Sequence, residues 1–290
     1  MSEYVIITDA AADLSSELAE KCDVTVIPMT FNINGKEYYY YPGSNEMDTH
    51  EFYENLRQGN MSTTSAINIA TYIDTFEPYL KKGLDILTIG FSASFSTCYG
   101  ILLLAAAELR EKYPERKIYC VDSLCASMGQ ALLVYLAGMK RLSGAGIDEV
   151  NRFVLEKRDH IAHWFTVEDL NHLKRGGRLP AAIAVAGILM GIKPVLYINE
   201  EGHIVKSSAV RGRTSSLAAL VDNMEKNADP PEGQLVFIGH ADSPEDAKKL
   251  EQMIRERVKT KEIYISDIGP IIGSHVGPGT LGLFFLEKQK

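Results

Sequence analysis

In the first half of the chain, short apolar runs alternate with longer stretches in which apolar side chains recur every three or four residues. A short apolar run predicts a buried strand, and the longer spacing predicts a helix packed on one side. The predicted strands are residues 4–9, 23–33, 85–91 and 117–123, with a hairpin-like turn at 34–41. The predicted helices are residues 101–113, 125–141 and 147–161. Strands that alternate with helices in this way predict an α/β fold with a mainly parallel sheet.

After residue 160 strand candidates become more frequent and helices fewer. The strand candidates are residues 163–167, 194–199, 203–210, 234–241, 262–268 and 282–287. Helices are expected at residues 215–227 and 244–258. This change predicts two lobes, an amino-terminal α/β lobe of residues 1–163 and a carboxy-terminal α/β lobe of residues 164–290.

The charge balance argues against nucleic acid as a partner. The 290 residues include 30 basic and 38 acidic side chains, which give a formal net charge of −8, and no basic tract is present. Nucleic-acid-binding proteins instead concentrate positive charge on one face.

The spacing of the cysteines and the lengths of the apolar runs argue against several further classes of protein. Cys22, Cys98, Cys120 and Cys125 are scattered without CxxC spacing, which predicts neither a zinc site nor a disulfide framework. No HExxH pair is present, so the sequence predicts no metal. The longest uncharged apolar run, residues 179–192, is shorter than the ~20 residues that cross a bilayer. The amino terminus does not resemble a signal peptide, and we predict a cytoplasmic protein.

Polar side chains cluster where predicted parallel strands end, which is the edge at which such sheets bind ligands. The clusters are Thr8, Asp9 and Asp13; Ser92, Ser94, Ser96 and Thr97; Asp122 and Ser123; and the hydroxyls of residues 62–65. Each cluster could simply cap a helix, because Ser, Thr and Asp side chains accept free backbone N–H groups there. A helix needs one cap, however, and residues 92–97 offer more hydroxyl groups than capping uses. They favour an anion site, for a carboxylate or a phosphate.

Two glycine-containing segments of the second half carry further candidates. Basic side chains, among them Arg178, flank a Gly-Gly turn. The small apolar residues of 181–192 then predict a helix that either packs closely on a neighbour or walls a cavity. The segment 273–282 predicts a glycine-bent link between strands that carries His275. A structural role and a role in a site both stay open for His275. No GxSxG elbow and no Walker A sequence is present, and no GxGxxG follows the first strand.

Taken in order, these motifs resemble the DegV family of bacterial fatty-acid-binding proteins over nearly the whole chain. The shared motifs are TDAAADL, the TS pair Thr64–Ser65, SASFSTCY at 92–99, VDS at 121–123, LKRGGRL at 173–179 and GPIIGSHVGPGTLGLFF at 269–285. Each motif is weak alone, and their order and spacing make the resemblance specific. The sequence departs from the family pattern at Ala10, Ala93, Thr97 and Cys98, which fall at the expected ligand end.

The resemblance implies a two-lobed DegV-type fold that holds one long-chain fatty acid in an apolar tunnel between the lobes, without a cofactor. The implied carboxylate-binding residues are Thr64, Ser65, Ser92, Ser94 and Ser96. Arg178 and His275 are implied to lie by the headgroup and to serve a separate fatty acid kinase, which makes an acyl phosphate from the bound acid. The protein itself would be non-catalytic, with transient membrane or acyltransferase contacts. Residues 181–192 and 101–109 are the candidate tunnel walls.

Two other functions stay open from the residues themselves. His275 could carry a phosphoryl group in a phosphotransferase-type component. Alternatively, Ser96 and His275 could act together in a serine hydrolase, although the missing strand–elbow–helix motif makes this the weakest of the three hypotheses.

Overall fold

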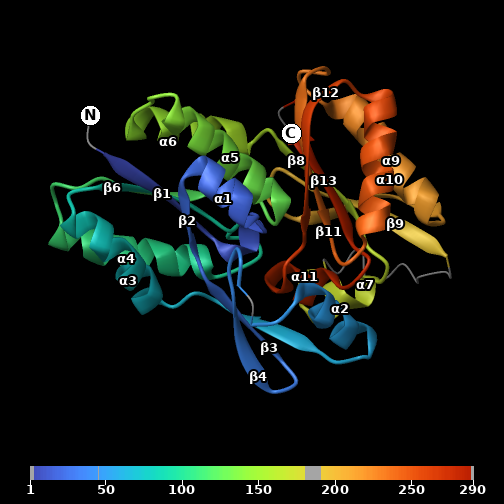
Figure 1. The fold of residues 1–290 in the computed structure, drawn as a ribbon, viewed down its shortest axis with the longest axis horizontal. Helices are drawn as coiled ribbons and strands as arrows, with labels where there is room; N and C mark the ends of the chain where they lie inside the picture. The colour runs from blue at the N-terminus through green and yellow to red at the C-terminus, as the bar shows by residue number, and fades with distance from the viewer. Residues whose placement is uncertain (1–2, 45, 180–190, 289–290) are drawn as a thin grey trace.

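The computed structural model describes residues 3–44, 46–179 and 191–288. Its first sheet is fully parallel and confirms the predicted α/β fold. The strand order is β2 (Val24–Ile27), β1 (Tyr4–Asp9), β6 (Asp85–Gly90) and β7 (Ile118–Asp122). One face packs on α1 (Ser16–Cys22), α5 (Met128–Leu142) and α6 (Ile147–Arg158). The other face packs on α3 (Ile69–Lys81) and α4 (Cys98–Lys112), as Figure 1 shows.

The second sheet has six strands of mixed direction. Its order is β10 (Ile204–Arg211), β9 (Ile192–Ile198), β8 (Ile161–Thr166), β13 (Leu281–Leu286), β11 (Gln234–His240) and β12 (Thr260–Asp267). Strands β11 and β12 are parallel, and the other neighbours are antiparallel. Helices α9 (Arg213–Asn227) and α10 (Pro244–Arg257) cover one face. Helix α5 contacts β8, β11 and β13 from the other side, so it lies between the two sheets.

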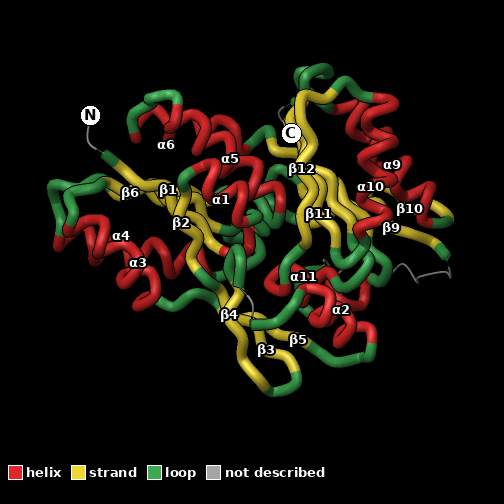
Figure 2. Tube along the Cα trace, viewed as in Figure 1, coloured by secondary structure: helices red, strands yellow, loops and turns green. Residues whose placement is uncertain are grey.

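A third, antiparallel sheet of order β4 (Lys36–Tyr40), β3 (Met29–Ile33) and β5 (Ser62–Ser65) extends away from the first lobe (Figure 2). The predicted single strand 23–33 is wrong. It breaks at Pro28, which has no N–H to donate, and β2 and β3 join different sheets. The predicted hairpin is confirmed: Asn34 and Gly35 both have positive φ, as a tight two-residue turn requires.

Short helices join the three sheets. Helix α2 (Thr49–Arg57) follows β4, α7 (Leu170–Arg175) follows β8, and α11 (Pro270–Val276) lies between β12 and β13. Helix α11 contacts α2, α7, β3 and β5, so it lies where all parts of the chain meet.

The division into residues 1–163 and 164–290 stays a prediction, and strand β8, the first of the second sheet in sequence, spans it. The helix expected at 181–192 lies almost wholly outside the described residues, and its last residue, Ile192, begins β9. Within the described ranges, no helix combines the length and apolar character that a membrane crossing requires.

Candidate ligand-binding site

A cavity of about 300 Å³ lies where the loops of the first lobe, helix α11 and the inner face of the six-stranded sheet meet. Most of its lining is apolar, and the side chains come from the second and third sheets, from α11 and from loops that follow strands of the first sheet. Examples are Phe91 after β6, Phe165 on β8, Ile198 on β9 and Ile271 on α11. An enclosed apolar space with a few polar groups is the usual form of a small-molecule site.

The structure brings five of the seven predicted site residues to this cavity. They are Thr64, Ser65, Ser96, Arg178 and His275. Ser65 and Thr64 end β5, Ser96 belongs to the loop before α4, and His275 lies on α11. These residues come from distant parts of the sequence and form a polar mouth on an apolar cavity.

Ser92 and Ser94 are not among the lining residues of the cavity. Ser92 is fully buried, and its Oγ accepts a hydrogen bond from the Ser94 N–H at 3.3 Å. The Ser94 hydroxyl donates to the carbonyl of Glu201 at 3.0 Å, and Ser94 lines a more open cleft next to the cavity. The Ser92 hydroxyl therefore holds the loop in shape, and the Ser94 hydroxyl joins the loop to the turn between β9 and β10.

The Ser96 hydroxyl faces the cavity from a tight turn. The N–H groups of Phe95 and Ser96 both donate to the carbonyl of Ser92, at 3.1 and 3.3 Å. The Ser96 Oγ accepts from the Cys98 N–H at 3.2 Å at the start of α4. Its one hydroxyl hydrogen can donate to the Cys98 sulfur or to an acceptor in the cavity.

Acidic side chains at the ends of β1 and β7 hold this loop in place through hydrogen bonds to its backbone. A carboxylate oxygen of Asp9 accepts from the Phe91 N–H at 2.8 Å, and Asp122 accepts from the Ala93 N–H at 3.3 Å. The strand ends do meet at one edge, as parallel strands predict. These two carboxylates bind the backbone of the loop there.

His275 lies in the last turn of α11, so the predicted glycine-bent link between strands is wrong. Pro270 at the first position of this helix suits its fixed φ. Gly273 serves close packing there: a Cβ would lie 2.5 Å from the hydroxyl of Tyr53 on α2. The glycines of this segment thus allow helices to approach, and only after α11, at Gly277 and Gly279, do they take positive φ.

The imidazole of His275 is held in a neutral state. Its Nε2 lies 2.9 Å from the Thr64 Oγ1, and its Nδ1 is buried with no hydrogen-bond partner among the residues that the structure describes. Burial, and secondarily the nearby positive charge of Arg178, lower the pKa of His275 to about 4. The ring is packed against Gly176, where a Cβ would lie 2.5 Å from Nδ1.

Arg178 stands between the cavity and the open cleft and lines both. Its Nε and Nη2 donate to the Phe95 carbonyl at 3.1 and 2.9 Å, and its Nη1 donates to the Gly176 carbonyl at 2.6 Å. Arg178 therefore fixes the Ser96 loop to the turn after α7 and adds positive potential at the mouth.

Sequence reasoning missed most of the cavity wall. Alternate residues of β8 and β13 line it, namely His163 and Phe165, and Gly282 and Phe284. Period-two spacing on a strand is the signal that could have identified them. The proposed wall at 101–109 is wrong for the described cavity: Leu102 packs into the core beside the first sheet, and Leu104 is exposed.

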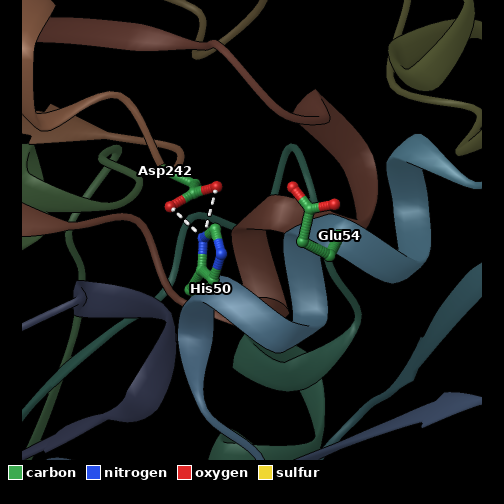
Figure 3. A group of neighbouring side chains, drawn as sticks. All are labelled: His50, Glu54 and Asp242. Carbon is green, nitrogen blue, oxygen red and sulfur yellow. Dashed lines mark hydrogen bonds and ion pairs between the residues drawn. The ribbon is translucent and has the colours of Figure 1, made fainter.

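A second cluster of ligand-type side chains lies on the surface, shown in Figure 3. His50 and Glu54 of α2 approach Asp242, with their ligand atoms within 4.8 Å of one another. The His50 Nδ1 is 3.0 Å from both carboxylate oxygens of Asp242. Arg57 pairs with Glu54 at 2.7 Å and also with Asp242. Because a guanidinium already neutralises both carboxylates, this cluster is an ion-pair network between α2 and the second lobe.

The fold and the cavity define a two-lobed α/β protein built around an apolar binding site with a polar mouth. The chain belongs to the DegV family. The family model, described as uncharacterised DegV-family proteins, matches residues 3–288.

Individual relatives match over their whole length. A DegV domain-containing protein of Clostridium perfringens is 42% identical over 290 residues, which is 100% of this chain and 99% of the relative. Among solved structures, a DegV-family protein of Thermus thermophilus, described as binding fatty acid, has a TM-score of 0.89 at 25% identity and covers 99% and 100% of the two chains. A protein of Eubacterium ventriosum, described as stearic-acid-binding, has a TM-score of 0.83 at 25% identity and covers 99% of both chains.

Proposed function

We propose that this protein is a non-catalytic carrier that holds one long-chain fatty acid, with the hydrocarbon tail in the cavity and the carboxylate at the mouth. The observation that carries the proposal is the largely apolar cavity whose polar side chains include Thr64, Ser65, Ser96 and His275. Two relatives that share the fold over their whole length are described as binding fatty acid or stearic acid, which supports the same ligand class here.

The energetics of such a ligand fit a cavity of this kind. Moving an aliphatic tail of about 15 carbons out of water yields about 0.8 kcal/mol for each carbon, or ~12 kcal/mol in total. Association costs several kcal/mol of this. A charge-assisted hydrogen bond adds ~1.5–3 kcal/mol. The tail therefore supplies most of the affinity, and the mouth sets the direction of the ligand.

The neutral His275 prepares Thr64 to donate to a carboxylate. A proton on the buried, unpartnered Nδ1 would leave an N–H without an acceptor, which is costly. The proton therefore belongs on Nε2, which donates to the Thr64 Oγ1. The Thr64 hydroxyl hydrogen is then free to point into the cavity, alongside that of Ser96.

The same arrangement suits presentation of the carboxylate to a separate fatty acid kinase. Arg178 borders both the cavity and the open cleft, so a carboxylate held by Thr64 and Ser96 would lie close to an opening. In the proposed reaction a carboxylate oxygen attacks the γ-phosphorus of ATP, ADP leaves, and an acyl phosphate forms. The kinase supplies the nucleotide site, and this protein supplies the oriented acid.

The two other functions receive less support from the geometry. A phosphoryl carrier needs a free imidazole nitrogen, whereas the Nε2 of His275 is bonded to Thr64 and Nδ1 is buried against Gly176. A serine hydrolase needs His275 to accept a proton from Ser96, but the ring is paired with Thr64.

Extraction of the purified protein with organic solvent, followed by mass spectrometry, tests ligand binding. We expect one long-chain fatty acid per chain, and a lipid-free protein that also fails to take up added acid would contradict the proposal. Thr64→Val should weaken binding about tenfold or more, because one hydrogen bond to the carboxylate is lost. Thr63→Val is the matched control, since Thr63 lies on the same strand, is exposed and does not line the cavity.

Presentation to a kinase has its own test. The lipid-loaded protein is incubated with MgATP and hydroxylamine, which traps an acyl phosphate as a hydroxamate. We expect no product from this protein alone and product when a fatty acid kinase is added. Hydroxamate formed by the protein alone would show that it is itself the kinase.

A further inference from the structure

The proposed function leaves unexplained the acidic motif that follows β1. Asp9 and Asp13 flank the short 3₁₀ helix Ala10–Ala12 and are each 2% exposed. Neither lines the cavity or the cleft. Asp13 adopts a left-handed backbone conformation, with φ 51°. Burying two carboxyl groups side by side is costly unless their oxygens are used.

Asp13 bonds to two segments that do form the cavity wall. Its Oδ2 lies 2.5 Å from the hydroxyl of Ser127, which immediately precedes α5 and lines the cavity. Its Oδ1 accepts from the Gly269 N–H at 2.8 Å, and Gly269 is the N-cap of α11. One carboxyl group from the first lobe thus joins the start of α5 to the start of α11.

We propose that Asp13 is a positioning residue for the binding site, because its carboxyl group fixes the start of α11 against the start of α5 and so sets where His275 and the α11 wall stand. Helix α11 carries Ile271, Ile272 and His275 into the cavity. This inference rests on the proposed function for its ligand.

The residues packed around the start of α11 leave little room for another group to replace the Asp13 carboxyl group. The ring of Tyr40 packs so closely on Gly269 that a Cβ there would lie 2.2 Å from it. Ser127 also has a positive φ of 52°, a conformation that a non-glycine residue holds only when its surroundings fix it. Without the carboxyl group, the Gly269 N–H and the Ser127 hydroxyl would be buried with their present partner lost.

The carboxyl group can do this in its protonated form. Burial, with smaller contributions from the negative charges of Asp267 and Asp9, raises the pKa of Asp13 to about 8, although the hydrogen bonds from Ser127 and Gly269 act in the opposite direction. The phenols of Tyr40 and Tyr53 also face it, from β4 and α2. The ionised carboxylate accepts from the Ser127 hydroxyl, whereas a protonated Asp13 can donate its O–H to the Ser127 Oγ while its other oxygen accepts from Gly269. An asparagine reproduces this pattern with its amide N–H and carbonyl oxygen.

The test compares Asp13→Asn, Asp13→Ala and Ser127→Ala in the full chain. The readout is the release rate of cis-parinaric acid, a fluorescent fatty acid, between about pH 6 and pH 9. We expect release from Asp13→Ala to be about tenfold faster at neutral pH, with Ser127→Ala between it and the unsubstituted protein. Release from the unsubstituted protein should accelerate as the pH rises through about 8. Release from Asp13→Asn should lack this acceleration.

Several results would overturn the inference. A folded Asp13→Ala that releases the acid at the original rate would do so. The same pH profile for Asp13→Asn and the unsubstituted protein would also do so. If Asp13→Ala does not fold, the pH comparison with Asp13→Asn decides the question.

A second readout separates this inference from the proposed function. If the unsubstituted protein binds no cis-parinaric acid or other fatty acid, the proposed function fails. Positioning by Asp13 is then judged from hydrogen exchange of residues 268–276 in the ligand-free protein. Exchange should be faster in Asp13→Ala or Ser127→Ala and unchanged in Asp13→Asn at neutral pH. Equal exchange in all four proteins would overturn the inference.

Discussion

The two faces of the six-stranded sheet are built from alternate residues of the same strands, yet one face is filled and the other borders a cavity. On the filled face, Trp164 of β8 and Phe285 of β13 pack into a continuous core with α9 and α10. On the hollow face, their neighbours Phe165 and Phe284 line the binding cavity. The filled face stabilises the lobe, and the hollow face leaves apolar surface for a ligand to cover.

Matched substitutions on the two faces should separate these roles most clearly. Phe285→Ala removes a fully buried ring from the filled face and should lower the free energy of unfolding by about 3–5 kcal/mol. Phe165→Ala should cost only about 1.5–3 kcal/mol in delipidated protein, because its ring already borders open space. Urea denaturation of both delipidated variants measures the difference. Equal losses would show that the two faces are packed alike.

Filling the hollow face should abolish binding while the fold is kept. Ile198→Trp places a larger side chain into the cavity and should reduce bound fatty acid to below about a tenth per chain, at an overpacking cost of about 1–3 kcal/mol. Ile265→Trp on β12 is the control, because Ile265 is 36% exposed and does not line the cavity. The measurement is lipid content by mass spectrometry, with circular dichroism as the check on folding. Full lipid content in Ile198→Trp would place the ligand elsewhere.

The difference between the faces also marks the limit of prediction from sequence. Alternation of strands and helices was enough to predict the parallel sheet, because each short apolar run needs helices on both sides. It could not distinguish filled from hollow, because Trp164 and Phe165 are equally apolar and only the elements packed above them differ. Whether a cavity forms beside a strand depends on tertiary packing, which leaves no local pattern in the sequence.

The polar mouth was predicted better than the walls. Thr64, Arg178 and His275 were expected to meet and do so, although His275 arrives on a helix instead of a bent link. The glycines of 273–282 suggested a bend, which the structure has only at Gly277 and Gly279, whereas Gly273 serves contact with Tyr53 across α2 and α11. Such contacts join residues more than two hundred positions apart in the chain, so no local spacing reveals them.

The smallest expected effect is the pH dependence of stability that His275 causes at the mouth of the cavity. The pKa of His275 is lowered to about 4 in the folded protein, below its ordinary value of 6.5. As the pH falls below about 6.5, the imidazole of His275 is protonated in the unfolded chain before it is protonated in the folded protein. The stability that the neutral ring contributes is therefore lost between about pH 6.5 and pH 4. His275→Asn should therefore lose less stability than the unsubstituted protein between pH 7 and pH 5, by on the order of 1 kcal/mol. Urea denaturation at both pH values measures this, with His203→Asn, an exposed site, as control. An identical loss in His275→Asn and the unsubstituted protein would mean that the pKa of His275 is not lowered in the folded protein, and the surroundings would then not hold the ring in the neutral state that prepares Thr64 as a donor.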